Sequence, residues 1–490
     1  MSTRPSLKAL PDLSRSARVP AYRRDGLSAG IVHIGVGNFH RAHQAFYLHE
    51  LFDAGTDHDW AIIGAGIKSY DAAMRDRLEP QDWLTTVVEL DPNGYKATVT
   101  GAMIDFAPVD SGSLIELLAR PGIRIVSLTV TEGGYFVDAR SGGFDRQNAD
   151  IRRDIENPDD PQTVFGIIIA ALARRRTAGI APFTVMSCDN LPENGHVTRR
   201  TVLGLASEMA GDFAGWIEGN VSFPNSMVDC ITPATGQRER ALVQEKFGIE
   251  DAAPVVCEPF RQWVMEDDFP NGRPALEKVG VEFVSDVAPY ELMKLRILNG
   301  GHATIAYPSA LLGIHFVHDA MANPLVTGFL DALEHREIMP TVPAIEGVDF
   351  EAYYRNVVER FSNQAVGDTI PRLCLDGSNR QPKFILPAIR DRLEAGLPVD
   401  GLALEVALWC RFCAGTDANG APLEIPDEKA DQLNDHALRA RDDPPVFLGQ
   451  SEIFGDLADN DTFVHTFSAN LDRLWRDGIA ACLEAYRAAG

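Results

Sequence analysis

The feature that most constrains the fold is a glycine turn that directly follows a short apolar run near the N-terminus. Residues 31–36 read IVHIGV, and Gly35 and Gly37 frame the turn that ends the run. A strand that leads through such a turn into a helix is typical of a dinucleotide-binding fold, where the two glycines allow a tight turn and close approach of a pyrophosphate. The third glycine of the usual pattern is replaced by His40. The turn therefore predicts a nucleotide loop only together with the strands that follow it.

Further strand-like runs alternate with helical segments through the first half of the chain. The expected helix after the turn runs from residue 38 to about 52, and the expected strands cover residues 60–65, 84–90, 124–130 and 183–187. Alternating strands and helices favour an α/β fold with a doubly wound parallel sheet. Residues 255–258 and 281–284 are expected to add to the same sheet.

The pattern changes after about Pro289. Helices are expected over residues 291–302, 323–335, 350–361, 402–414 and 468–488, and strand-like runs become scarce. A chain of 490 residues is also too long for one ordinary core. We therefore predict a Rossmann-type dinucleotide-binding domain with insertions over residues 1–288, and a mainly helical substrate and catalytic domain over residues 289–490.

Composition excludes several classes of function. The 70 acidic and 45 basic side chains give a net charge of -25, which disfavours binding to nucleic acid and to anionic membranes. No apolar run approaches the roughly 20 residues that span a bilayer, and the N-terminal segment lacks the apolar stretch of a secretory signal. Seven scattered cysteines argue against a disulfide framework. A cytoplasmic protein is expected.

The segment after the second expected strand bears on the choice of cofactor. Residues 64–69 read GAGIKS and contain no acidic residue for the ribose hydroxyls, so Asp71 is the nearest one. Lys68 is instead suited to the extra phosphate of NADP. The choice between NAD and NADP stays open at this point.

The most informative segment is the expected helix around Lys294. At about 100° per residue, Asn299 lies roughly 140° and His302 roughly 80° around the helix from Lys294, so all three can lean towards one pocket. The helix is apolar nearly all round, and burial would lower the pKa of a lysine there. A neutral amine can take a proton from an alcohol, and an asparagine amide can stabilise the resulting alkoxide without a metal.

Three competing patterns are weaker. Tyr290 and Lys294 form the YxxxK pair of short-chain dehydrogenases, but the pair lies far too late in the chain. His40 and His43, with His33 and His49 nearby, have no further ligands around them, and we assign them no metal. The CxxC pair in the apolar run LEVALWCRFCAG (residues 404–415) is expected to lie in the core.

Five blocks, in order along most of the chain, resemble the long-chain mannitol dehydrogenase family. Lys294, Asn299 and His302 match its KxxxxNxxH signature. The other blocks are GVGNFHRAH (residues 35–43), TEGGY (residues 131–135), SCDNLPENG (residues 187–195) and MVDCITP (residues 227–233). The family signature usually has arginine after the aspartate of the last block, where this chain has Cys230.

The resemblance implies a Rossmann-type domain joined to a helical one, with catalysis in the cleft between them. It implies Lys294 as general base, Asn190 and Asn299 as the oxyanion hole and His302 as a partner of the reacting oxygen. Asp229 and Arg372 would hold substrate hydroxyls, and Glu132 would conduct the proton to solvent. Gly35, Gly37 and Phe39 would form the cofactor loop.

The activity implied is a zinc-independent, reversible, NAD(P)-dependent oxidation of a sugar alcohol, D-mannitol first, to the ketose D-fructose. The resemblance also suggests a monomer. Three alternatives stay open: a hexuronate (fructuronate or tagaturonate) reductase of the same family, a dehydrogenase specific for arabinitol or sorbitol, and a nucleotide-sensing protein without catalysis. In the TEGGY block Gly134 stands where the reductases tend to carry lysine, which favours an uncharged polyol.

Overall fold

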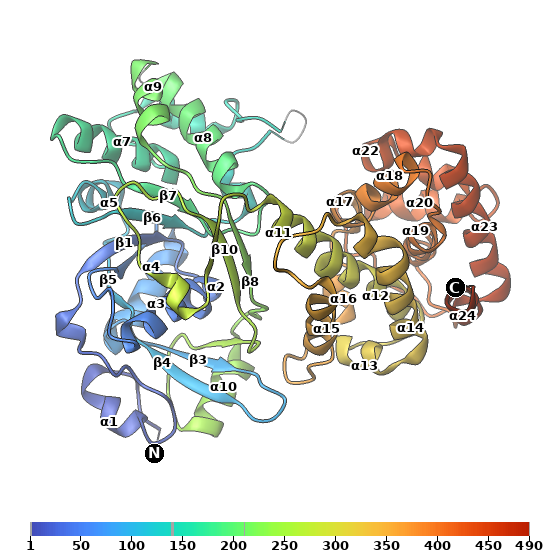
Figure 1. Cartoon of the computed structure of the whole chain (residues 1–490), viewed down its shortest axis with the longest axis horizontal. Helices are drawn as coiled ribbons and strands as arrows, with labels where there is room; N and C mark the ends of the chain where they lie inside the picture. Colours follow the sequence, from blue (N-terminus) through green and yellow to red (C-terminus); the bar gives the residue numbers. More distant parts are fainter. Residues whose placement is uncertain (1, 139–141, 210, 490) are drawn as a thin grey trace. The chain divides into compact units, whose positions relative to one another are not determined.

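The chain forms two compact units, Met1–Ala288 and Pro289–Gly490, in a computed structural model that describes residues 2–138, 142–209 and 211–489. The first unit contains the β-sheets, and the second is built from helices (Figure 1). This arrangement confirms the predicted fold class of a Rossmann-type domain followed by a mostly helical one.

The central sheet of the first unit has five parallel strands in the order β5-β2-β1-β6-β7. They are β1 (Ala29–Ile34), β2 (Ala61–Ala65), β5 (Met103–Phe106), β6 (Ile125–Leu128) and β7 (Thr184–Ser187). The chain runs outward from β1 to β5 on one side and from β6 to β7 on the other. The strand order therefore reverses between β1 and β6, and in open α/β sheets ligands bind at the carboxyl ends of strands beside such a reversal.

Helices bury both faces of this sheet, as its apolar strands require. Val32 and Ile34 share one core with α5 (Ser111–Leu118), α7 (Val164–Thr177) and α8 (Asn194–Met209). Ile31 belongs to a second core that includes α3 (Gln44–Asp53). Because successive side chains of a strand point to opposite faces, the short run IVHI contributes to both cores.

Three predicted strands were assigned to the wrong sheet. The strand predicted at 84–90 is β3 (Thr85–Glu89), and the strand predicted at 255–258 is β9 (Val255–Cys257). They pair with each other, and β3 also pairs with β4 (Lys96–Thr100), in a separate sheet. The strand predicted at 281–284 is β11 (Glu282–Val284), in a third sheet with β10 (Gln262–Glu266) and β8 (Ser226–Asp229). Val87 and Val88 are both fully buried, so the run looks like a strand of a covered parallel sheet, and hydrophobic periodicity does not identify its neighbours.

Two predicted helices are interrupted. The helix expected from residue 38 to about 52 breaks at His43 into α2 (Asn38–Ala42) and α3. The helix expected at 468–488 corresponds to α23 (Asp461–Asp477) and α24 (Ile479–Ala488), which are separated at Gly478. Gly478 has φ 86°, a left-handed conformation that glycine adopts readily.

The second unit is organised around α19 (Asp400–Cys413), which is buried along nearly its whole length. It packs against α23 and α12 (Gly300–Leu311). Cys410 and Cys413 are at most 1% exposed in this core, which confirms their predicted core position. The helix predicted at 350–361 is α15 (Phe350–Phe361).

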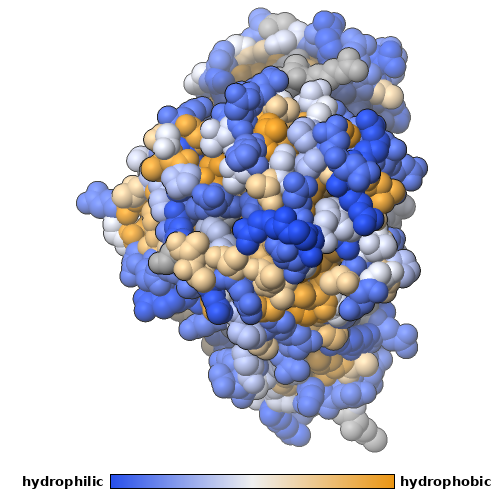
Figure 2. All heavy atoms as spheres, turned by 90° about the vertical axis from the view of Figure 1, so that its right-hand side faces the viewer, coloured by the Kyte–Doolittle hydropathy of each residue, from blue (hydrophilic) through white to orange (hydrophobic). Residues whose placement is uncertain are grey.

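Figure 2 shows one face on which hydrophobic side chains are interspersed among a majority of hydrophilic ones. The large exposed hydrophobic side chains are far apart in sequence: Leu7, Tyr70, Val137, Phe316, Leu375, Leu397 and Leu438. Within the described ranges, no helix has both the length and the apolar character needed to cross a membrane.

Glu405 of α19 is a buried carboxyl that links the stability of the second unit to pH. Its side chain is fully buried, and Gln381 Nε2 donates a hydrogen bond of 2.7 Å to its Oε1. Burial raises the pKa of Glu405 from 4.5 to about 8. Between these values the folded state holds a proton that the unfolded state has lost, so this group's contribution to stability decreases as pH rises and is lost above about pH 8.

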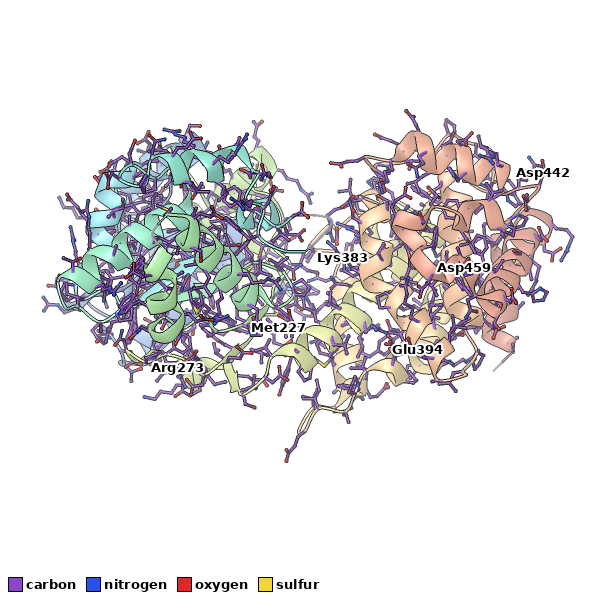
Figure 3. The ribbon with its side chains drawn as sticks, turned by 90° about the horizontal axis from the view of Figure 1, so that it is seen from above. Met227, Arg273, Lys383, Glu394, Asp442 and Asp459 are labelled. Carbon is purple, nitrogen blue, oxygen red and sulfur yellow. The ribbon has the colours of Figure 1, made fainter. Side chains whose placement is uncertain are left out.

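We expect Glu405→Gln to remove this pH dependence, because the amide stays neutral at every pH. Relative to the variant, the wild-type chain should lose on the order of 1 kcal/mol of stability per pH unit as pH rises through this range. Thermal unfolding at about pH 5.5, 7 and 8.5 measures it. Glu394→Gln is the matched control, since Glu394 is exposed at the end of α18 (Leu386–Glu394) (Figure 3). Equal pH slopes in Glu405→Gln and wild type would show that Glu405 titrates normally.

Candidate active site

Three loops at the carboxyl ends of β1, β6 and β7 carry predicted site residues of the first unit. Gly35 and Gly37 follow β1, Glu132 follows β6, and Asn190 follows β7. These strands are neighbours in the parallel sheet, so their carboxyl ends share one edge. The structure therefore brings the glycine loop, Glu132 and Asn190 to the edge where the strand order reverses.

The glycine loop has the backbone approach that a dinucleotide needs. Gly35 has φ 97°, and a Cβ there would lie 2.1 Å from the carbonyl oxygen of Thr129. At Gly37 the nearest atom to an added Cβ is 3.9 Å away, which leaves open space above the backbone. A side chain at Gly37 would fill the space where a pyrophosphate approaches, so these residues fit a nicotinamide dinucleotide.

In the usual pattern the third glycine allows the helix to pack closely on the strand. Here His40 stands at that position, and two stacked imidazole rings make the contact between helix and strand instead. His40 is 1% exposed, and its ring stacks on that of His33 in β1 with centroids 3.5 Å apart. Burial lowers the pKa of His33 to about 3, so its ring is neutral, and its nitrogens bond with Ser127 Oγ (2.8 Å) and Thr129 Oγ1 (2.9 Å). These histidines hold the glycine loop against β6. Among the described residues, no three His, Cys, Asp or Glu side chains are grouped so that they could hold a metal ion.

Asp189, which was not among the predicted site residues, joins the loops that carry Glu132 and Asn190. Its carboxylate accepts hydrogen bonds from the backbone amides of Val130 (2.8 Å) and Thr131 (3.0 Å) and from the Tyr135 hydroxyl (2.6 Å). Thr131 has φ 65°, a strained conformation for a β-branched residue. The two hydrogen bonds from the backbone amides to Asp189 hold it in that conformation. Glu132 begins the short helix η4 (Glu132–Tyr135) directly after this residue, and its side chain is exposed.

Asn194 likewise connects the loop after β7 to β8. Its Nδ2 donates to the carbonyl oxygens of Asp189 (3.0 Å) and Ser226 (2.7 Å), and its Oδ1 accepts from the Ser226 amide (2.9 Å). Asp229 ends β8 and is 6% exposed. Asp189 follows β7 by two residues, which was a signal available in the sequence, whereas Asn194 begins α8 and had no such signal.

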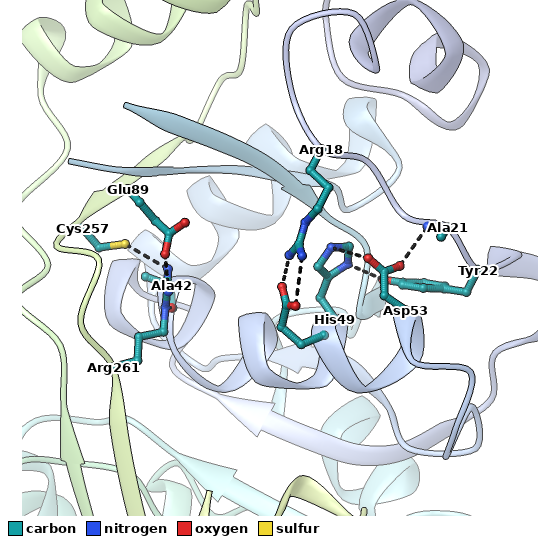
Figure 4. Close-up of polar contacts among 10 residues, drawn as sticks. Arg18, Ala21, Tyr22, Ala42, His49, Asp53, Glu89, Cys257 and Arg261 are labelled. Atoms are coloured by element: carbon teal, nitrogen blue, oxygen red, sulfur yellow. Dashed lines mark hydrogen bonds and ion pairs between the residues drawn. The ribbon is translucent and has the colours of Figure 1, made fainter. Parts of the chain in front are cut away.

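Cys230, the departure from the family signature, lies in a packed cluster with Phe46, Val87 and Cys257. A hydrogen bond with Cys257 and burial raise the pKa of Cys230, so its thiol is neutral. The nearby cation is Arg261, which pairs with Glu89 (2.7 Å) and donates to Cys257 Sγ (3.3 Å) (Figure 4). Phe39 of the glycine loop packs against the same cluster.

In the second unit, the helix that carries Lys294 contains a π-helical segment, η6 (Lys294–Asn299), between α11 (Ala288–Met293) and α12. In a π-helix hydrogen bonds join residues i and i+5, so Lys294 and Asn299 lie about one turn apart on the same side. His302 follows Asn299 by three residues in α12 and continues that side. The predicted offset of roughly 140° between Lys294 and Asn299 was therefore wrong, because it assumed α-helical geometry throughout.

The three side chains of this row differ in their surroundings. Lys294 is only 7% exposed. Asn299 Oδ1 and His302 Nε2 are buried and have no hydrogen-bond partner within the described part of the chain. The His302 ring stacks on Phe361 at 4.1 Å. Burial lowers the pKa of His302 well below its usual value, and Arg372, Arg360 and Arg380 lower it further, so this imidazole is neutral.

Arg372 lies near His302 and is held by Asp368, which precedes the short helix α16 (Ile370–Leu373) that carries Arg372. Its Nε and Nη2 donate to the two carboxylate oxygens of Asp368, each at 2.5 Å. Asp368 does not use Nη1, and the Arg372 side chain is 46% exposed. The structure thus groups Lys294, Asn299, His302 and Arg372 in the second unit, and Gly35, Gly37, Phe39, Glu132, Asn190 and Asp229 in the first.

Comparisons with known proteins cover both units. The protein-family model described as "Mannitol dehydrogenase Rossmann domain" matches residues 29–278. A second family model, "Mannitol dehydrogenase C-terminal domain", matches residues 286–475. A mannitol 2-dehydrogenase of Cereibacter sphaeroides is 56% identical over 97% of this chain and 100% of its own length.

Two solved structures are similar over nearly the full length. Mannitol 2-dehydrogenase of Pseudomonas fluorescens, in a ternary complex with NAD and D-mannitol, is 42% identical with a TM-score of 0.85 and 99% coverage of both chains. A D-sorbitol dehydrogenase in substrate-free form is 36% identical with a TM-score of 0.90, covering 99% of this chain and 100% of its own.

Proposed function

The chain belongs to the mannitol dehydrogenase family, and on that basis we propose that it catalyses the reversible NAD-dependent oxidation of a sugar alcohol, D-mannitol first, to the ketose D-fructose. The observation that carries the proposal is the single row formed by Lys294, Asn299 and His302 through the π-helical segment. A base, an amide donor and a neutral imidazole in one row match the needs of alcohol oxidation.

The residues of the second unit act on the reacting hydroxyl group. A nicotinamide dinucleotide held at the loop of Gly35 and Gly37 would supply the acceptor for the hydride of the carbinol carbon. Lys294 is buried and takes the hydroxyl proton, a step for which its amine must be neutral. The Asn299 amide donates a hydrogen bond to the oxygen as negative charge develops on it. His302 is neutral, and its Nε2 is available to the same oxygen.

The remaining predicted residues position the substrate and move the proton. Asn190 is a second amide donor to the reacting oxygen. Asp229 and the Nη1 group of Arg372 hold other hydroxyl groups of the polyol, since Asp368 already engages Nε and Nη2 of Arg372. Glu132 is exposed and passes the proton to solvent.

The similarity to a D-sorbitol dehydrogenase supports a second substrate of the same class. Mannitol and sorbitol differ in configuration at one carbon, so the shape of the pocket decides between them. A hexuronate would need a cation for its carboxylate. Of the three arginines near His302, Arg372 is already paired with Asp368. Gly134, which stands where the reductases tend to carry lysine, favours an uncharged polyol.

An absorbance assay at the reduced-nicotinamide band tests the proposal. The purified chain is given NAD or NADP with mannitol, sorbitol, arabinitol or xylitol, with and without a metal chelator. We expect NAD reduction that the chelator does not affect, fastest with mannitol. No reduction with any polyol, together with oxidation of NADH by fructuronate, would instead identify a hexuronate reductase. Loss of activity in chelator would contradict the metal-independent mechanism.

We also propose that the enzyme is monomeric and cytoplasmic. All seven cysteines are buried free thiols, as expected of a protein kept in a reducing compartment. The net charge of -25 opposes self-association. Sedimentation velocity at physiological salt measures the oligomeric state directly.

A further inference from the structure

Two cysteines from different strands of the first unit meet at their side chains. Cys230 directly follows β8, and Cys257 ends β9. The residues that follow them are joined, because the Glu258 amide donates to the Ile231 carbonyl (3.0 Å) and the Glu258 carboxylate accepts from the Ile231 amide (2.6 Å). The Cys230 thiol donates a hydrogen bond to the sulfur of Cys257. The two sulfurs are therefore in direct contact.

An arginine fixes the position and the charge state of this pair. The Arg261 guanidinium donates to Cys257 Sγ at 3.3 Å (Figure 4). Its Nε is held by the Ala42 carbonyl (2.7 Å) and its Nη1 by Glu89 (2.7 Å). The hydrogen bond from Cys230 and the charge of Arg261 lower the pKa of Cys257 in spite of its burial. A thiolate beside a cation is the reactive form of cysteine.

The remaining cysteines are in a different chemical state. Burial raises the pKa of their thiols, which stay protonated and unreactive: these are Cys188, Cys374, Cys410, Cys413 and Cys482. Within the contacting pair, Cys230 is 8% exposed and Cys257 is fully buried. A small oxidant therefore reaches the pair from the side of Cys230.

We propose that Cys230 and Cys257 are a redox-sensitive dithiol that a peroxide converts to a disulfide, and that this disulfide weakens polyol binding at Asp229. One sulfur attacks a peroxide oxygen, breaks the O–O bond and becomes a sulfenic acid as water is released. The other sulfur then displaces a second water and forms the S–S bond. The dithiol loses two electrons, its two protons end in water, and the peroxide is reduced to water.

The disulfide acts on the site because Cys230 is the next residue after Asp229. An S–S bond of about 2.0 Å is far shorter than a hydrogen-bonded contact between two thiols, so Cys230 has to move towards Cys257. Asp229 then moves with it. The sulfur of Cys257 also loses the negative charge that Arg261 binds. The inference rests on the proposed function only in the role that it gives to Asp229.

Peroxide treatment of the purified full-length chain tests the proposal. The chain is incubated with dilute hydrogen peroxide, separated from it by gel filtration, and assayed with D-mannitol and NAD before and after addition of dithiothreitol. We expect peroxide to raise the KM for mannitol about tenfold, the effect of losing one hydrogen bond to the substrate, and dithiothreitol to reverse the change. Mass spectrometry of unreduced peptides should detect the peptide that is linked through Cys230 and Cys257.

Serine variants show whether the effect belongs to this pair. Cys230→Ser and Cys257→Ser should each abolish the reversible rise in KM, with every variant compared with its own untreated sample. Cys482→Ser is the matched control, because Cys482 is also a buried thiol, in α24, and this variant should respond to peroxide as the wild type does.

Three results would overturn the inference. They are absence of the linked peptide in samples whose methionines are already oxidised, an equal reversible rise in KM in Cys230→Ser, and formation of the linked peptide with an unchanged KM. The proposed function fails separately. A linked peptide in a chain that oxidises no polyol would keep the dithiol and remove the function, and mannitol oxidation that peroxide does not change would keep only the function.

Discussion

Lys294→Ala is expected to reduce the rate of polyol oxidation by about 10²- to 10⁴-fold, the range in which a positioned general base contributes. No other amine is in the row that Lys294 forms with Asn299 and His302 on the helix Ala288–Leu311. Binding of NADH, measured by fluorescence titration, should change little, because the glycine loop belongs to the other unit. Steady-state rates with saturating polyol and NAD measure the effect.

The control and a rescue experiment separate a catalytic role from a structural one. Lys429→Ala removes a lysine of the same unit that forms only a 3.8 Å ion pair with Glu452, and its activity should match wild type. A small primary amine added to Lys294→Ala should restore part of the rate, because the cavity left by the side chain admits it. Wild-type turnover in Lys294→Ala would remove Lys294 from the mechanism.

Local sequence patterns were sufficient to predict the glycine turn after the first strand and the type of each domain. Gly35 and Gly37 are recognisable because their requirements arise within one short turn and the strand before it. The helix that continues from that turn was predicted unbroken, yet it breaks at His43, whose φ of -116° and ψ of -89° are not helical. Nothing in the composition of residues 38–52 distinguishes a continuous helix from two helices joined at one residue.

Residues whose role is to join distant segments could not be predicted in the same way. Asp189 links the loop after β7 to amides of residues 130 and 131, and this becomes visible only when β6 and β7 are known to be neighbours. The assignment of β3 and β9 to the central sheet failed for the same reason. Their apolar residues indicate burial, and the partner strand is set by tertiary packing.

Lys68 and Asp71 show how the structure resolves an ambiguity that the sequence leaves open. The sequence left both residues as candidates for contact with the adenosine ribose. The two backbone amides bonded to Asp71 remove it from that role, and the exposure of Lys68 leaves the lysine available. The side-chain types alone did not distinguish a capping carboxylate from a ribose ligand.

The π-helical segment explains why the signature residues are spaced as they are. With α-helical geometry throughout, a spacing of five would place Lys294 and Asn299 well apart around the helix. One π turn aligns them, and the next three residues of α12 bring His302 to the same side. Such π turns within α-helices are frequent at functional sites. The proposed roles of Lys294 as base and Asn299 as amide donor on one oxygen therefore require this segment to keep its π-helical geometry.

Asn299→Ala is accordingly expected to lower kcat by about 10²- to 10³-fold, as loss of one donor to a developing oxyanion does, with a small change in KM. Asn470→Ala is the matched control, since Asn470 is half-buried in α23 and its side chain donates a hydrogen bond to the Asp400 carbonyl at 3.2 Å. The double variant Lys294→Ala/Asn299→Ala should be little slower than Lys294→Ala alone, because residues that act as a unit are not additive. Independent, multiplicative losses would mean that the two side chains serve different steps, and the single row along the helix would then have no catalytic meaning.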